Sequence, residues 1–253
     1  MNILAIGNSF SEDATKYLHQ IAEADDVDIN VVNLYIGGCS LETHWNNILQ
    51  DEKAYEYSLN GSFEGRMASI KEVVLEHEWD FITLQQASGL SGIKESFYPY
   101  IRDISNYLIE TAPNAKQIIH QTWAYEIDST HPSFLNYNNS QENMYEKLKE
   151  AYYSVAEDLN LTLIPCGDVV QAARRNKCFN YGKGGISLCR DGYHMDFIYG
   201  RYLTAAVWYR FFTGRSIVKN TFRFDSRSGA DEVLIKAIKL IVDEKLEGLK
   251  NSK

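Results

Sequence analysis

A serine near the start of the chain and a histidine near its end have the neighbours that acyl-transfer chemistry needs. Ser9 lies in the segment GNSFS at 7–11, and His194 follows Asp191 by three residues. A serine hydroxyl becomes a nucleophile when a histidine takes its proton, and a carboxylate must fix the tautomer of that histidine. An aspartate three residues earlier, across the turn at Gly192, can fold back onto the imidazole Nδ1. The spacing therefore fits a nucleophile, a base and an orienting acid.

The same residues also have ordinary structural explanations. Ser9 or Ser11 can cap the helix that follows the first strand, because a hydroxyl oxygen accepts a free N–H of the first turn. Asp191 can cap a later helix, with His194 in its first turn. Neither segment alone decides between capping and catalysis.

Two further segments offer hydrogen-bond donors. Gly38 follows an expected strand, where a glycine lets a backbone N–H approach a bound oxygen closely. Gln85 and Gln86 follow another strand, and a side-chain amide can donate to a developing oxyanion. The alternatives are a simple turn glycine and two amides that tie down the next loop.

The elements expected around these residues alternate between strands and helices. Strand patterns cover 3–6, 28–36, 80–84, 117–122 and 161–164, and 51–65 reads as a loop or short hairpin. Helical patterns cover 12–25, 41–49, 66–77, 98–111, 141–159, 167–176, 195–212 and 229–249. This alternation predicts a parallel sheet with helices on both faces. Ser9, Gly38 and Gln85 then meet at the carboxyl edge, where such sheets bind ligands, between the loops 87–97 and 126–141.

Length and composition indicate one α/β domain over residues 1–253, with 221–253 as a C-terminal helical extension packed on it. The chain has 253 residues, 45% of them hydrophobic, and a formal net charge of −9. The acidic balance argues against nucleic acid or an anionic membrane as a partner. The amino terminus enters the first strand without a signal-like segment, so we expect a cytoplasmic protein unless a signal peptide has been removed.

Neither a metal nor an organic cofactor is expected. The cysteines match no zinc spacing and are expected to be free thiols, and no glycine-rich dinucleotide or phosphate-binding loop follows the first strand. The histidines His44, His120 and His131 are scattered, and His120 lies in an apolar strand as a core residue would. Several aromatic residues near the expected strand ends can either stack on a sugar or pack in the core: Trp45, Trp123, Tyr125 and Tyr193.

Taken together, these segments resemble the sequence blocks of the SGNH (GDSL-type) hydrolases. GNSFS at 7–11 is similar to the first block, with Asn8 where the family usually has Asp. Gly38 resembles the glycine of the second block, and Asp191-x-x-His194 resembles the last. The third block normally reads Gly-x-Asn-Asp, whereas LQQAS at 84–88 is closer to the glutamine-bearing version of carbohydrate acetylesterase and sialate esterase relatives.

The resemblance implies a three-layer α/β/α sandwich with five parallel strands, the flavodoxin-like SGNH hydrolase fold. It implies Ser9 as nucleophile, His194 as base and Asp191 as orienting acid. The oxyanion hole would be formed by the N–H groups of Ser9 and Gly38 and by the side chain of Gln85, with Gln86 as the alternative donor. Gln86, Trp123 and Tyr193 are candidates for substrate binding.

The expected activity is hydrolysis of a small acyl ester through an acyl-enzyme. An acetyl group on a carbohydrate fits the glutamine-type third block, so the expected partner is a small-molecule ester or acylated sugar. One alternative is a non-catalytic carbohydrate-binding protein on a hydrolase scaffold, and another is a structural α/β domain of a larger complex. The oligomeric state is not predicted.

Overall fold

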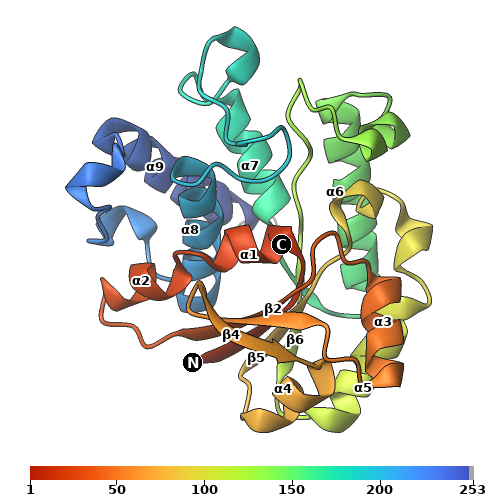
Figure 1. Ribbon diagram of the computed structural model, residues 1–253. Coiled ribbons are helices and arrows are strands. Elements are labelled where there is room, and N and C mark those ends of the chain that lie inside the picture. Colours follow the sequence, from red (N-terminus) through yellow and green to blue (C-terminus); the bar gives the residue numbers. More distant parts are fainter. Residues whose placement is uncertain (251–253) are drawn as a thin grey trace.

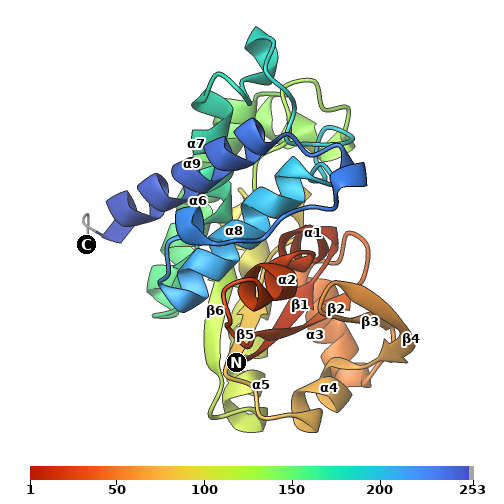
Figure 2. The same ribbon diagram turned by 90° about the vertical axis from the view of Figure 1, so that its left-hand side faces the viewer.

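The computed structural model describes residues 1–250, which form one sheet of seven strands between layers of helices (Figures 1 and 2). The strand order is β4-β3-β2-β1-β5-β6-β7. Five neighbouring strands are parallel: β2 (Asn30–Tyr35), β1 (Asn2–Gly7), β5 (Phe81–Leu84), β6 (Lys116–His120) and β7 (Thr162–Ile164). Counted along the chain, their order is 2-1-3-4-5, which is the flavodoxin-like order.

The predicted parallel strands are confirmed, but the predicted total of five is too low. An antiparallel hairpin of β3 (Tyr55–Leu59) and β4 (Ser62–Ala68) extends the sheet beyond β2. Its turn is Asn60-Gly61, with both residues at positive φ (51° and 81°). An Asn-Gly pair between alternating segments is a strong hairpin signal. Because β4 extends to Ala68, the next helix begins at Ile70, with Ser69 as its N-cap, and not at residue 66 as the sequence predicted.

The helices divide between the two faces of the sheet in the way that right-handed crossovers require. On one face lie α1 (Ser9–Thr15), α2 (Leu18–Glu23), α7 (Cys166–Arg175) and α8 (Tyr199–Thr213) (Figures 1 and 2). On the other lie α3 (Leu41–Gln50), α4 (Ile70–Glu76), α5 (Tyr100–Thr111) and α6 (Gln141–Asp158). The last helix, α9 (Glu232–Lys250), packs on α7 and α8 as an outer element (Figure 2).

Two helix starts differ from the sequence-based expectation, and both differences matter for the site. The first helix begins at Ser9 rather than residue 12, because Asn8 is its N-cap and accepts the N–H of Phe10. The helix expected from residue 195 begins at Tyr199, because the carboxylate of Asp196 accepts the N–H groups of Ile198 and Tyr199. The segment before it is therefore free to form the irregular loop that carries His194.

Candidate active site

The side chain of Ser9 connects to His194 and Asp191 through two short hydrogen bonds. Ser9 Oγ lies 2.8 Å from His194 Nε2. On the other side of the ring, His194 Nδ1 lies 2.7 Å from Asp191 Oδ2. The structure thus brings together three residues that are up to 185 positions apart in the chain, in the order of a nucleophile, a base and an orienting carboxylate.

The capping alternatives do not describe these residues. Asn8, not Ser9 or Ser11, provides the N-cap of α1. Asp191 lies in a loop, where its Oδ1 accepts the N–H groups of His194 (2.8 Å) and Tyr193 (3.3 Å). Partial burial raises the pKa of Asp191, but these hydrogen bonds and the imidazole beside it outweigh burial and hold the pKa below its ordinary value. Asp191 is therefore kept as a carboxylate that faces the imidazole.

Gly38 lies beside Ser9 at the end of β2. Its φ of +66° is a left-handed conformation that L side chains rarely adopt, so a glycine is favoured at this turn. Gly38, Ser9 and His194 line one cleft of about 410 Å³ at the carboxyl edge of the sheet. This location agrees with the rule that open α/β sheets bind ligands where the strand order reverses.

The two glutamines do not line this cleft. Gln85 is buried and spans two neighbours, with its Nε2 donating to Asn8 Oδ1 at 2.6 Å and its Oε1 lying 3.0 Å from His120 Nδ1. Gln86 is also buried. Its Oε1 accepts a hydrogen bond from the N–H of Leu41, and its Nε2 donates one to the carbonyl of Ser96. The structure therefore does not place Gln85 as an oxyanion donor, or Gln86 as a donor or substrate-binding residue. Both amides satisfy buried backbone and side-chain groups instead.

Of the two aromatic candidates for substrate binding, only Tyr193 reaches the cleft. Trp123 is fully buried, stacks on Phe10 at 4.3 Å and donates its Nε1 hydrogen to the carbonyl oxygen of Tyr193. Trp123 thus supports the loop of Tyr193 from below. The cleft is also lined by His131, Ser133 and the segment 87–90. These residues belong to the loops 87–97 and 126–141, which the sequence predicted to flank the site. The sequence indicated no role for His131, which was considered only as a metal ligand and rejected.

A network of neutral groups lies beneath Ser9. The N–H of Phe10 can only donate, which identifies the atom of Asn8 that it meets as the amide oxygen. Asn8 Nδ2 then donates to the carbonyl of Cys39, in the loop next to Gly38. Because Gln85 donates to Asn8, its oxygen faces His120, and His120 Nδ1 carries the hydrogen. Burial lowers the pKa of His120 to about 3, so this ring is neutral.

The loop that carries His194 is held instead by charged groups. Asp13, fully buried on α1, accepts hydrogen bonds from Arg190 Nη1 (3.0 Å), Arg201 Nε (2.7 Å) and the N–H of Met195 (2.8 Å). The turn itself is closed by Arg190 N–H donating to the carbonyl of His194 at 2.9 Å. Asp13 therefore fastens the loop that carries His194 to the helix that begins with Ser9.

A second buried ion pair fastens the other end of this loop. Glu126 and Arg174 are almost fully buried, with Oε2 and Nε 3.7 Å apart. Arg174 Nη1 also donates to the carbonyl of Ala124, and Ser187 Oγ donates to Glu126 Oε2 at 3.0 Å. The N–H of Glu126 donates to the carbonyl of Gly192 at 2.7 Å. Both sides of the Asp191–His194 turn are thus anchored.

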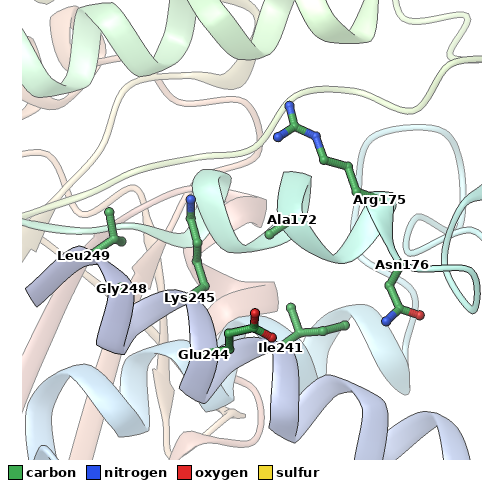
Figure 3. Close-up of a pocket in the computed structure, with 8 residues that line it drawn as sticks. All are labelled: Ala172, Arg175, Asn176, Ile241, Glu244, Lys245, Gly248 and Leu249. Carbon is green, nitrogen blue, oxygen red and sulfur yellow. The ribbon is translucent and has the colours of Figure 1, made fainter. Parts of the chain in front are cut away.

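A larger open groove of about 530 Å³ lies between α7 and α9 (Figure 3). The figure shows Arg175 and Lys245 along it, but its lining contains no hydroxyl, thiol or imidazole. No group of three or more potential metal ligands is found in residues 1–250. Over the same residues, no helix combines the length and apolar character needed to cross a membrane.

Comparisons with known proteins agree with this fold. The model of a family described as "Domain of unknown function (DUF4886)" matches residues 2–239. The crystal structure of a DUF4886 family protein from Bacteroides uniformis is 34% identical, with a TM-score of 0.88 over 97% of this chain and 94% of that chain. No curated protein matches the sequence.

Two more distant structures are similar in fold. A predicted SGNH hydrolase from Slackia heliotrinireducens has a TM-score of 0.55 at 22% identity, over 83% of this chain and 97% of that chain. The acetyl xylan esterase AlAXEase has a TM-score of 0.55 at 14% identity, over 82% of this chain and 98% of that chain. The resemblance inferred from the sequence blocks is thereby confirmed at the level of fold.

Proposed function

Because the chain belongs to the DUF4886 family and has the fold of the SGNH hydrolases, we propose that it is a serine esterase. The observation that carries the proposal is the connected set Ser9–His194–Asp191, with distances of 2.8 and 2.7 Å. A binding protein has no need for a hydroxyl, an imidazole and a carboxylate in this order. The reaction proposed is hydrolysis of a small acyl ester through an acyl-enzyme.

In this mechanism His194 takes the proton of Ser9 as its Oγ attacks the ester carbonyl. The negative oxygen that forms is stabilised by the N–H groups of Ser9 and Gly38, two residues that line the cleft. His194 then gives its proton to the leaving alcohol, and later activates the water that releases the acid. Asp191 holds the imidazole in the required tautomer and stabilises its protonated form.

The size and chemistry of the cleft support a small acyl group. The cleft measures about 410 Å³ and contains glycines, serines and aromatic residues rather than a continuous apolar lining. A long acyl chain would need an extended apolar channel to leave water. An acetyl ester on a carbohydrate alcohol is the substrate class that we propose, since the name of the structural neighbour AlAXEase refers to acetyl groups on a polysaccharide.

The test is hydrolysis of p-nitrophenyl acetate by the wild-type protein and by Ser9→Ala. We expect turnover by the wild type and a loss on the order of 10⁴ or more in the variant. A fluorophosphonate probe should label the wild type at Ser9 and leave the variant unlabelled. Equal turnover by the two proteins would contradict the proposal, and glycan binding without labelling would favour the non-catalytic alternative.

A further inference from the structure

The lining of the cleft includes a histidine that no step of the mechanism uses. His131 begins the short turn of 3-10 helix over Pro132–Tyr137, in the loop after β6. Its Nδ1 accepts the N–H of Ser133 at 3.1 Å. A backbone N–H can only donate, so Nδ1 carries no hydrogen and the neutral ring has its hydrogen on Nε2. His131 therefore presents an N–H donor.

Within the described part of the chain, this donor meets no acceptor. Across residues 1–250, the hydrogen bonds of His131 involve its backbone N–H, its carbonyl oxygen and its Nδ1, and Nε2 takes part in none. The side chain lines the cleft and is half-buried. Burial and the neighbouring His194 lower the pKa of His131, which keeps the ring neutral and its tautomer fixed. The Nε2–H group of this cleft residue is thus available to a ligand oxygen.

Aromatic contacts fix the ring and relate it to the base. His131 lies 4.8 Å from the ring of Tyr125 and 4.8 Å from that of Tyr193, which it meets edge to face. Tyr193 in turn lies 4.2 Å from His194. Because His194 protonates the leaving oxygen, the alcohol part of the ester must lie next to His194. The alcohol is therefore placed beside Tyr193 and within the region that His131 faces.

The charges around the cleft narrow the chemistry of this alcohol. None of the residues that line the cleft is Asp, Glu, Lys or Arg. A phosphate or carboxylate on the substrate would leave a charge with no partner, which is costly near a half-buried wall. Serine hydroxyls and the imidazole N–H suit neutral hydroxyl groups, and the ring of Tyr193 suits an apolar C–H face.

We propose that His131 Nε2–H donates a hydrogen bond to a hydroxyl oxygen of the alcohol part of the substrate, and that this alcohol is a neutral, polyhydroxylated ring such as a pyranose. His131 is then a specificity residue, because it distinguishes a sugar ester from an ester of the same shape without hydroxyls. This assignment rests on the proposed esterase activity and adds the part of the substrate that the site recognises.

The test compares matched esters. The sugar esters are the four monoacetates of methyl glucoside, and the carbocyclic esters are cyclohexyl acetate and cyclohexylmethyl acetate. The measured quantity is kcat/KM of the best sugar ester divided by that of the better carbocyclic ester. One neutral hydrogen bond corresponds to about a tenfold preference, which we expect in the wild type and expect to be lost in His131→Phe. His131→Gln, which restores an N–H near the position of Nε2, should recover part of it.

The control variant is His77→Phe, at an exposed histidine that follows α4 and is not among the residues of the cleft. It should keep both the activity and the preference of the wild type. A wild type without preference for any sugar ester, or a preference that survives His131→Phe, would overturn the role of His131 while leaving the esterase proposal intact. No hydrolysis of p-nitrophenyl acetate and no labelling of Ser9 would instead overturn both.

Discussion

The two sides of the Ser9–His194 pair are held in place by different kinds of interaction. Beneath Ser9, the polar groups are neutral: the amides of Asn8 and Gln85 and the imidazole of His120. Around His194, the groups are charged: Asp13 between Arg190 and Arg201 on one flank, and the Glu126–Arg174 pair on the other. The Ser9 side is a hydrogen-bonded amide network, and the His194 side is a set of buried ion pairs.

The difference follows from the elements that carry the two residues. Ser9 lies between a buried strand and the helix that it begins, so the register of β1 with β2 and β5 already fixes its backbone. His194 lies in an irregular loop, whose only ladder contact among the described residues is the bridge between Cys189 and Met195. Charge-assisted hydrogen bonds are about twice as strong as neutral ones. A loop without a sheet or helix of its own needs such anchors to hold His194 within hydrogen-bond reach of Ser9.

The largest effect is expected for Asp191→Asn, which removes the charge that faces the base but keeps its size. The amide can turn its N–H toward the imidazole and favour the wrong tautomer, so kcat should fall on the order of 10⁴. The measurement is p-nitrophenyl acetate hydrolysis, with urea unfolding to confirm that the fold persists. A loss of less than about tenfold would show that Asp191 is only part of the loop structure.

The second-largest effect is expected for Asp13→Asn. Asp13 is not among the residues that line the cleft. Removing one member of a buried ion pair costs about 3–5 kcal/mol, since the partners lose their nearest counter-charge. The base should also be displaced, and a misplacement of about 1 Å can lower kcat 10²-fold. The kinetic readout separates this role from simple support, because kcat should fall while Ser9 still reacts slowly with the fluorophosphonate.

Asp225→Asn is the matched control for Asp13→Asn. Asp225 and Arg227 are also 3.0 Å apart, but their side chains are 60% and 90% exposed. Exposed pairs contribute about 0–1 kcal/mol. If both variants lost the same stability, burial would not be what gives the Asp13 cluster its strength, and the contrast between the two sides of the site would be wrong.

The sequence could predict the Ser9 side better than the His194 side, for the same physical reason. The apolar run 3–6 and Gly7 after it are local patterns, and they correctly indicated β1, the turn and the position of Ser9. Asp191 and His194 were visible because they are three residues apart. Their anchors were not, since Asp13 and Arg190 are 177 positions apart and each reads as an ordinary surface residue of a charged segment.

The glutamines illustrate the opposite failure. Two amides at a strand end suggested donors for an oxyanion, but the sequence cannot show which buried groups compete for them. In the structure Asn8 Oδ1 accepts the hydrogen bond that Gln85 Nε2 donates. Gln86 bonds to the N–H of Leu41 and to the carbonyl of Ser96. The choice between a cleft and a core position depends on tertiary packing, which strand periodicity does not report.

A smaller effect is expected for Asn8→Asp, which gives the chain the aspartate that the first block usually has. A carboxylate can still accept from Phe10 and Gln85, but it cannot donate to the carbonyl of Cys39, so two acceptors would face each other. An unsatisfied buried group costs about 1–3 kcal/mol. Urea unfolding should show this loss, and kcat should fall about tenfold as the Gly38 turn loosens. Higher activity in this variant would contradict the neutral network beneath Ser9.

The smallest effect concerns the pH dependence of stability, and it tests whether the ring beneath Ser9 is kept neutral. Burial lowers the pKa of His120 to about 3 in the folded state, whereas an unfolded histidine titrates near about 6.5. Its contribution is complete above the unfolded value and is lost as pH falls toward the folded value, because the unfolded chain then binds a proton that the folded ring does not. Between these values the free energy of unfolding should fall by about 1.4 kcal/mol for each pH unit that the pH falls.

His44, whose pKa is also lowered to about 3 by burial, should add an equal dependence on pH. Urea unfolding at pH 6 and pH 5 measures the change in the free energy of unfolding per pH unit. This change should be smaller by the contribution of one histidine in His120→Gln, of one in His44→Gln and of two in the double variant. An unchanged slope in His120→Gln would mean that the ring accepts a proton in the folded state, and charge would then be present on both sides of the site.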